Sequence, residues 1–191
     1  MNEKELYQYH EDIFKPIYAD MVATIGSKPE QIAFELEAAL SHIAVAHTKP
    51  DIFDINIAKA YGHLQRAALD AAKIMWIEYR ERAEKIILNP DLRAFAANAS
   101  ENELISMFQE AETKAREARK HELESTGNNP SSSIEKYYEA AQLFSEIVSK
   151  IDPEKINKLT RFKTILLRKE VVISFLTGVA SSTIVSILLG A

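Results

Sequence analysis

The last 21 residues of the sequence, 171–191, contain no charged side chain. As an α-helix this segment is about 31 Å long, which matches the hydrocarbon core of a bilayer at about 30 Å. The alternative is a buried core helix, but a core helix of this length usually keeps a polar stripe that faces water. We therefore predict that a single transmembrane helix over 171–191 anchors the chain.

Charge is distributed unevenly along the chain. Residues 1–150 carry 17 Lys and Arg against 25 Asp and Glu, a net −8, whereas residues 151–191 carry 6 against 3, a net +3. Lys and Arg that flank a membrane span stay on the cytoplasmic side. We therefore expect a cytoplasmic domain at 1–152 and a basic juxtamembrane helix at 153–170, in a single-pass protein of the cell inner membrane. The N-terminus is acidic and lacks an apolar run, so no signal peptide is expected.

Small and weakly polar residues recur every four positions within 171–191. The row comprises Ser174, Gly178, Ser182, Ser186 and Gly190, and it is adjoined by Thr177 and Ser181. Small residues at this spacing let membrane helices approach closely, and hydroxyls hydrogen-bond across the contact. We predict that the span self-associates into a homo-oligomer, and the same face is a candidate pore lining if several copies converge. In an ordinary anchor, Ser and Thr instead bond to their own helix.

Helical patterns predominate before the apolar segment. The chain contains only 5 Gly and 6 Pro, and no alternating apolar run bounded by turn residues predicts a strand. The predicted class is all-α: a cytoplasmic bundle of about five helices, followed by one long helix that runs from Pro153 through the membrane. The expected helices of the bundle cover 2–25, 27–48, 54–88, 100–125 and 132–151.

Cap and breaker residues define the expected helix ends. Pro16 is expected to kink the first helix and Gly26 to end it. Asp152 before Pro153 is a predicted N-cap with proline at the first helical position. Serine followed by glutamate three positions later predicts capping boxes at Ser27 with Glu30, at Ser100 with Glu103 and at Ser132 with Glu135.

The helix expected at 54–88 carries a row of cations. They are spaced seven residues apart, with a histidine and an aspartate on the same face: Lys59, His63, Arg66, Asp70, Lys73 and Arg80. Such a basic stripe is a candidate binding site for a nucleotide or an oligonucleotide backbone, although no aromatic side chain interleaves it. The alternative is a structural ion-pair layer formed with Glu35 and Glu37 of the preceding helix.

Motifs of enzyme chemistry are scarce. The absence of cysteine excludes thiolate metal sites and cysteine nucleophiles, and no phosphate loop, Gly-x-Ser-x-Gly or metal-binding His pair occurs. We therefore predict no enzyme, cofactor or metal site. Arg116 and His121 form an R-x4-H pair similar to the motif of HEPN ribonucleases, but Glu117 stands where a polar residue usually follows the arginine. The alternative is a solvated charged helix.

This layout, with a helical domain, a degenerate HEPN-like pair at Arg116 and His121 and one membrane helix, resembles small bacterial antiphage membrane effectors. The Hailong channel effector and the CRISPR accessory pore protein are of this kind. The resemblance covers the layout of the whole chain and transfers no functional residue. It implies membrane permeabilisation or depolarisation after phage infection, gated through the cytoplasmic domain.

Three hypotheses follow. In the first, the chain forms a regulated oligomeric pore or ion channel, and a nucleotide, an oligonucleotide or a protein partner acts on the helical domain. In the second, the chain is a tail-anchored adaptor that conducts nothing. In the third, it is a membrane-tethered HEPN-type ribonuclease.

Overall fold

The computed structural model describes residues 2–124, 130–167 and 169. Their helices are α1 (Glu3–Tyr9), the π-helix η1 (His10–Phe14), α2 (Lys15–Ile25), α3 (Glu30–Thr48), the 3-10 helix η2 (Pro50–Ile52), α4 (Phe53–Ile87), the π-helix η3 (Leu92–Ala96), α5 (Glu101–Glu124) and α6 (Ser131–Ser149). A further helix covers 153–167. Within the described ranges there is no strand, only an isolated bridge between Ala97 and Ile151. The predicted all-α class is confirmed for this part of the chain.

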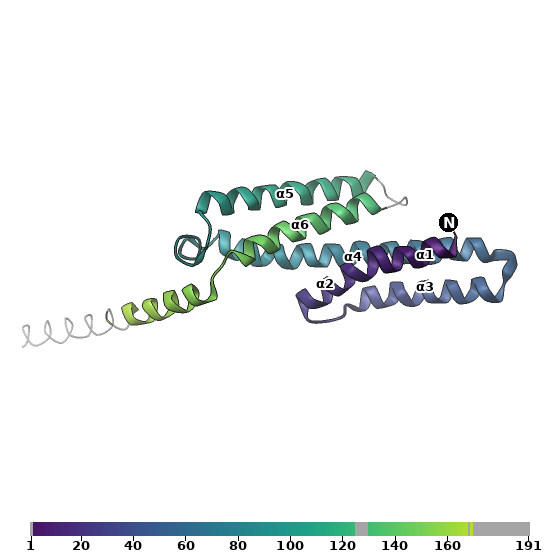
Figure 1. Ribbon diagram of the computed structural model, residues 1–191, viewed down its shortest axis with the longest axis horizontal. Coiled ribbons are helices and arrows are strands. Elements are labelled where there is room, and N and C mark those ends of the chain that lie inside the picture. The colour runs from purple at the N-terminus through teal and green to yellow at the C-terminus, as the bar shows by residue number, and fades with distance from the viewer. Residues whose placement is uncertain (1, 125–129, 168, 170–191) are drawn as a thin grey trace, which may run out of the picture.

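Helix α4 is the central element, and its 35 residues give it a length of about 52 Å. Helix α3 packs on its N-terminal half, whereas α5 and α6 lie along its C-terminal half (Figure 1). Helix α2 also contacts α4, and its end reaches the C-terminal half, where Thr24 contacts Tyr79 and Arg82. The buried face of α4 is rich in alanine, at positions 60, 67, 68, 71, 72 and 83, so neighbouring helices can approach its backbone closely. The result is an elongated bundle in which all the other long helices are arranged around α4.

Two apolar clusters hold the bundle together. The larger contains residues of every α-helix from α1 to α6, and Met21, Ile32 and Ile57 are fully buried in it. The smaller lies toward the C-terminal end of α4 and contains Leu104 and Phe144. Burial of each such side chain contributes about 1.5–3 kcal/mol. Together they fix the positions of the polar groups on α4.

The predicted helix over 2–25 is confirmed, with an irregular turn before Pro16. Because proline has no backbone N–H, it cannot complete the regular hydrogen-bond ladder. The chain forms η1 just before it, where Lys15 N–H donates to the carbonyl of His10. Gly26 ends α2 in the left-handed conformation, at φ 70°, as expected of a C-terminal glycine.

Of the three predicted capping boxes, only the one at Ser100 provides a side-chain cap. Ser100 Oγ accepts the N–H of Glu103 at 3.2 Å, as predicted for the start of α5. The boxes at Ser27 with Glu30 and at Ser132 with Glu135 are wrong, because Pro29 and Pro130 occupy the N-cap positions of α3 and α6 and neither helix has a side-chain cap. The rigid φ of proline, near −65°, sets these two helix starts instead.

The helix at 153–167 leaves the bundle at the end where α4 stops and α5 begins (Figure 1). Its predicted cap is confirmed, since Asp152 Oδ1 accepts the N–H of Glu154 at 2.8 Å. No helix formed by the described residues is long and apolar enough to cross a membrane. The predicted span at 171–191 lies outside the described residues.

Candidate functional site

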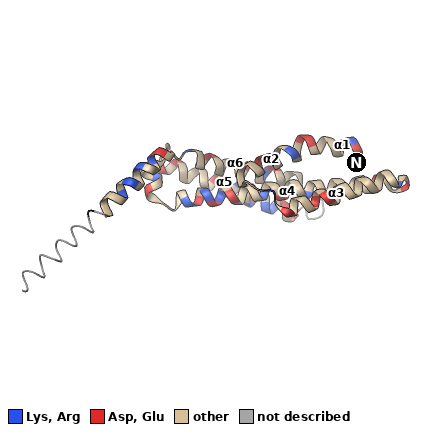
Figure 2. Ribbon diagram, turned by 90° about the horizontal axis from the view of Figure 1, so that it is seen from below, with Lys and Arg blue, Asp and Glu red and all other residues tan. Residues whose placement is uncertain are grey.

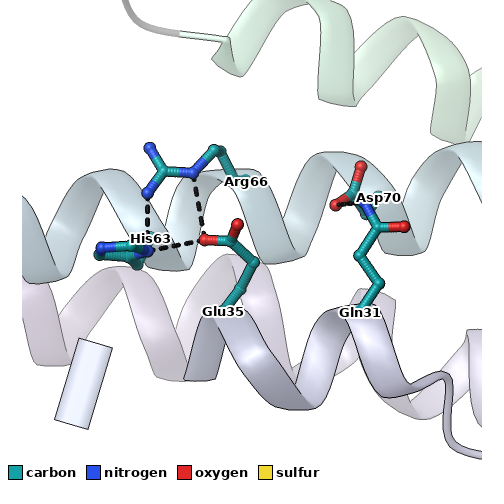
Figure 3. A network of polar contacts seen from close by, with 5 residues as sticks. All are labelled: Gln31, Glu35, His63, Arg66 and Asp70. Carbon is teal, nitrogen blue, oxygen red and sulfur yellow. Dashed lines mark hydrogen bonds and ion pairs between the residues drawn. The ribbon is translucent and has the colours of Figure 1, made fainter. Parts of the chain in front are cut away.

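The predicted basic stripe lies on α4, which is one uninterrupted helix over the whole set. We call Lys59, His63, Arg66, Asp70, Lys73 and Arg80 the α4 stripe. Figure 3 shows its first part against α3, where His63, Arg66 and Asp70 face Glu35 and Gln31. Farther along, the stripe faces α5. The two neighbouring helices supply acidic partners to most of it.

One carboxylate of α3 joins two residues of the stripe. Glu35 Oε2 lies 2.7 Å from His63 Nδ1 and 3.1 Å from Arg66 Nε. Arg66 Nη2 also lies 2.6 Å from the same His63 nitrogen (Figure 3). A neutral Nδ1 can accept from Arg66, whereas a protonated Nδ1 donates to Glu35. Whether Nδ1 of His63 carries a hydrogen, which depends on the tautomer, therefore decides which of the two contacts is favourable.

A second histidine stacks on this group. The rings of His42 and His63 are 5.2 Å apart with an interplanar angle of 25°. His42 Nδ1 lies 2.9 Å from Asn56 Oδ1, and the amide nitrogen of the buried Asn56 donates to the carbonyl of Ile52. Because Asn56 Oδ1 can only accept, His42 Nδ1 carries the proton.

Asp70 lies in the middle of the stripe. Its Oδ2 accepts a hydrogen bond from Gln31 Nε2 at 2.8 Å. Burial raises the pKa of Asp70, and the positive charge of Lys73 opposes this rise only in part. The site therefore disfavours the ionised form of this carboxyl group.

The next cation of the stripe meets α5. Lys73 Nζ lies 2.6 Å from Glu122 Oε1, and Glu122 Oε2 accepts from the hydroxyl of Tyr137 at 3.0 Å and from Arg119 at 3.1 Å. Burial opposes ionisation of Glu122, but the hydrogen bonds from Lys73 and Tyr137 outweigh it and lower its pKa. Burial and this hydrogen bond raise the pKa of Tyr137 to about 12. This cluster joins α4, α5 and α6.

The two ends of the stripe differ. Arg80 Nε lies 2.5 Å from Glu112 Oε1, and this hydrogen bond raises the pKa of Arg80. Lys59 is exposed and makes no ion pair with the described residues. Four of the five predicted ligand-binding residues are thus engaged with Glu35, Glu122 or Glu112.

This geometry matches the ion-pair layer considered as the alternative to an anion site. Glu35 contributes to it as foreseen, whereas no contact of Glu37 with the stripe is found among the described residues. Two grooves lie elsewhere, one of about 540 Å³ between α2, α4 and α6 and one of about 410 Å³ beside η1 and α6, and neither is lined by a residue of the stripe. The binding of a nucleotide or oligonucleotide to Lys59, His63, Arg66, Lys73 and Arg80 stays a prediction.

The other predicted residues occupy different places. Arg116 is exposed on α5, and His121 follows five positions later, about 140° around the helix. The candidate pore residues Ser174, Thr177, Gly178, Ser181, Ser182 and Ser186 lie outside the described residues. Within the described ranges, no group of three or more acidic or histidine side chains is arranged to hold a metal ion.

The sequence matches no protein-family model, and neither a curated protein nor a solved structure is significantly similar to the chain.

Proposed function

We propose that the protein is a membrane-anchored oligomeric effector whose 171–191 segments assemble into a regulated pore or ion channel, with antiphage defence as its setting. One observation carries this proposal. The helix at 153–167 leaves the end of the bundle, with most of its side chains exposed, and leads toward the 21 uncharged residues. A membrane accounts for both the exposed helix and the uncharged segment.

The composition of the projecting helix supports the membrane assignment. It exposes Phe162, Ile165, Leu166 and Leu167 together with several cations. Exposed apolar side chains beside lysine and arginine are typical of segments at the surface of a membrane. The same cations support the proposal that the bundle lies on the cytoplasmic side of the inner membrane, because Lys and Arg next to a span favour that side.

The row of small residues in 171–191 supports assembly. A monomeric anchor needs no such row, because lipid accepts large apolar side chains on every face of a helix. Self-association brings Gly178 and the neighbouring hydroxyls to the centre of the assembly. In an assembly of sufficient size, these hydroxyls line a narrow aqueous path.

Regulation acts through the bundle in this proposal. A nucleotide or oligonucleotide that binds the α4 stripe replaces Glu35, Glu122 and Glu112 as partners of the cations. Because these acids join α3 and α5 to α4, their release loosens the bundle. A phosphate ligand thereby changes the packing of the helices above the membrane.

A tail-anchored adaptor that conducts nothing is the second candidate. It is favoured by the pairing of the α4 stripe, since a set of cations already bound to acids works as a structural layer without any ligand. The adaptor needs the same anchor and uses the bundle as a docking module for a protein partner.

Conductance separates the two candidates. The full chain is purified in detergent, its oligomeric mass is measured, and it is reconstituted into planar bilayers. The channel proposal predicts an oligomer and discrete current steps. A membrane-inserted chain that never conducts, with or without added oligonucleotide, contradicts the channel and leaves the adaptor.

A further inference from the structure

The connection between α4 and α5 exposes two large apolar side chains. Leu88 is 73% exposed and Phe95 is 64% exposed, at the end of the bundle from which the helix 153–167 departs (Figure 1). We call residues 88–95 the tip. Because large apolar side chains gain free energy when they leave water, the tip is a candidate contact surface.

The tip is held firmly in place. Arg93 Nη1 donates to the carbonyl of Ile87 at the end of α4, which satisfies a carbonyl that the helix leaves free. Two backbone hydrogen bonds follow directly after the tip. The carbonyl of Ala96 accepts from the N–H of Asp152 at 2.9 Å, and the N–H of Asn98 donates to the carbonyl of Lys150 at 2.8 Å. These bonds tie the connection to the end of α6.

The projecting helix is fixed to the same connection. Lys155 Nζ donates to Asn98 Oδ1 at 2.6 Å, and Lys163 forms an ion pair with Asp91 within the tip. The tip and the helix are therefore positioned as one unit. The contact between Lys163 and Asp91 also neutralises the acid of the tip.

The distance to the uncharged segment is short. Lys163 precedes residue 171 by eight positions, and eight residues of an α-helix span about 12 Å. The polar zone of each leaflet is about 5–8 Å thick. A side chain of the tip that extends toward the membrane from beside Lys163 therefore reaches the headgroups.

Charge in this region suits an anionic surface. Lys158 and Arg161 are exposed and have no ion-pair partner in the part of the chain that the structure describes. Figure 2 shows blue lysine and arginine positions spaced along the projecting helix. Cations next to an anionic bilayer are attracted to its surface. Phe162 and Leu166, one turn apart on the same helix, add apolar surface.

The geometry points to a second membrane contact: the tip inserts Phe95 and Leu88 among the headgroups of an anionic leaflet, beside the anchor. This inference rests on the proposed membrane anchor and extends it. With two contacts instead of one, the bundle stands in a fixed orientation over the bilayer, and a change in its packing is transmitted to the anchor.

Tryptophan fluorescence tests the contact in the full chain. Trp76→Phe removes the single native tryptophan. Its buried Nε1 has no hydrogen-bond partner among the described residues, so the substitution leaves no acceptor there without its donor. Phe95→Trp in this background is reconstituted into vesicles of phosphatidylcholine and phosphatidylglycerol with brominated acyl chains. The matched control is Phe34→Trp on α3, since Phe34 is 65% exposed. It lies about 30 Å from the tip, because Gln31 faces Asp70, 18 residues before Leu88.

Brominated lipid is expected to quench Phe95→Trp several-fold more strongly than Phe34→Trp, and aqueous acrylamide to do the reverse. Equal quenching of both by acrylamide, with none by the lipid, overturns the inference. Protection of Phe95→Trp from both quenchers overturns it too, since another copy then covers the tip. If Phe95→Trp fails to fold, Leu88→Trp replaces it, and the same pattern of quenching is expected.

Extraction with alkaline carbonate separates this inference from the proposed function. A chain that resists extraction but shows no lipid quenching at residue 95 keeps its anchor and loses only the second contact. A chain that carbonate removes from the vesicles has no membrane span, and both proposals then fail.

Discussion

The bundle and the projecting helix 153–167 both carry lysine and arginine, but their charges have different surroundings. On α4 and α6, cations form ion pairs with acids of α5, as Lys73 does with Glu122 at 2.6 Å and Lys136 does with Glu117 at 3.0 Å. On the projecting helix, Lys158 and Arg161 point into solvent without a partner among the described residues.

This difference shows that the spacing of charges along one helix does not reveal their role. The heptad spacing of the α4 stripe is as regular as that of a binding face, yet the facing helices neutralise most of it. The net −8 of residues 1–150 already indicates that acids outnumber the cations available to them. Lys158 and Arg161, in contrast, precede the uncharged segment in the sequence, and a membrane is their proposed partner.

The largest effect is expected within 171–191. Gly178 stands in the row of small residues, and close approach of two helices requires the absence of a side chain there. Gly178→Leu should abolish both assembly in detergent and conductance in bilayers while leaving membrane insertion intact, since leucine favours the bilayer. Ser182→Leu, four residues farther along the same row, should behave alike.

Val179→Leu is the matched control, because it places the same side chain on the neighbouring position outside the row. It should keep the oligomeric mass and the current steps of the unmodified chain. Should Gly178→Leu assemble and conduct like this control, the row of small residues is neither an interface nor a pore lining.

A smaller effect is expected from charge reversal on the α4 stripe. Lys73→Glu places a second carboxylate beside Glu122 and should destabilise the fold by about 2–3 kcal/mol. For a domain of this size, the melting temperature then falls by roughly 4–10 °C. Thermal melts followed by circular dichroism measure the shift.

Lys59→Glu makes the same charge change on the same face of α4, where no ion pair is lost. Its free energy of unfolding should stay within about 0.5 kcal/mol of the unmodified chain. If both variants melt alike and both reduce the binding of an oligonucleotide, the stripe is an anion site and not a structural layer.

The pH dependence of stability is expected to differ between two carboxyl groups of the same region. The pKa of Glu122 is lowered in the folded state, so its contribution is full above the ordinary glutamate pKa of about 4.3 and is lost as the pH falls through the lowered value. Glu122→Gln should therefore cost about 1 kcal/mol near pH 7 and progressively less toward acid pH.

Asp70→Asn should change the free energy of unfolding in the opposite direction. The pKa of Asp70 is raised, so the folded chain takes up a proton before the unfolded chain does, and the unmodified protein gains stability from this group as the pH falls. The variant should be slightly more stable near pH 7 and lose that advantage in acid. Thermal melts of Glu122→Gln, Asp70→Asn and the unmodified chain at several pH values test both expectations. If the stability of both variants changes with pH in the same way, the two pKa shifts are contradicted.

Much of the fold follows from local sequence signals. The predicted helices at 54–88 and 100–125 agree with α4 and α5 within one residue at each end, because their apolar spacing is regular and their ends carry strong signals. Gly26 and Asp152 act as predicted, since each effect depends on neighbouring residues alone. The structure does not describe the predicted span.

The candidate site depends on contacts that spacing does not reveal. Glu122 follows Lys73 by 49 positions and Glu112 follows Arg80 by 32, so their pairing requires the packing of α5 against α4. The stacking of His42 on His63 likewise depends on the register of α3 and α4. The excess of acids over bases in residues 1–150 and the position of the preceding helix indicated Glu35 as a partner, but no sequence signal indicated Glu112 or Glu122.

Thiol labelling in intact bacteria tests most directly whether the unpaired cations hold the bundle at the cytoplasmic face of a membrane. The chain has no cysteine, so Ser132→Cys at the exposed start of α6 gives a single label site. We expect this cysteine to be shielded from a membrane-impermeant reagent and to react only after the cells are opened. Reversal of Lys158 and Arg161 to glutamate should expose a fraction of it, whereas Lys59→Glu should not. Labelling of the unmodified Ser132→Cys chain at the rate of a periplasmic control would contradict the proposed topology.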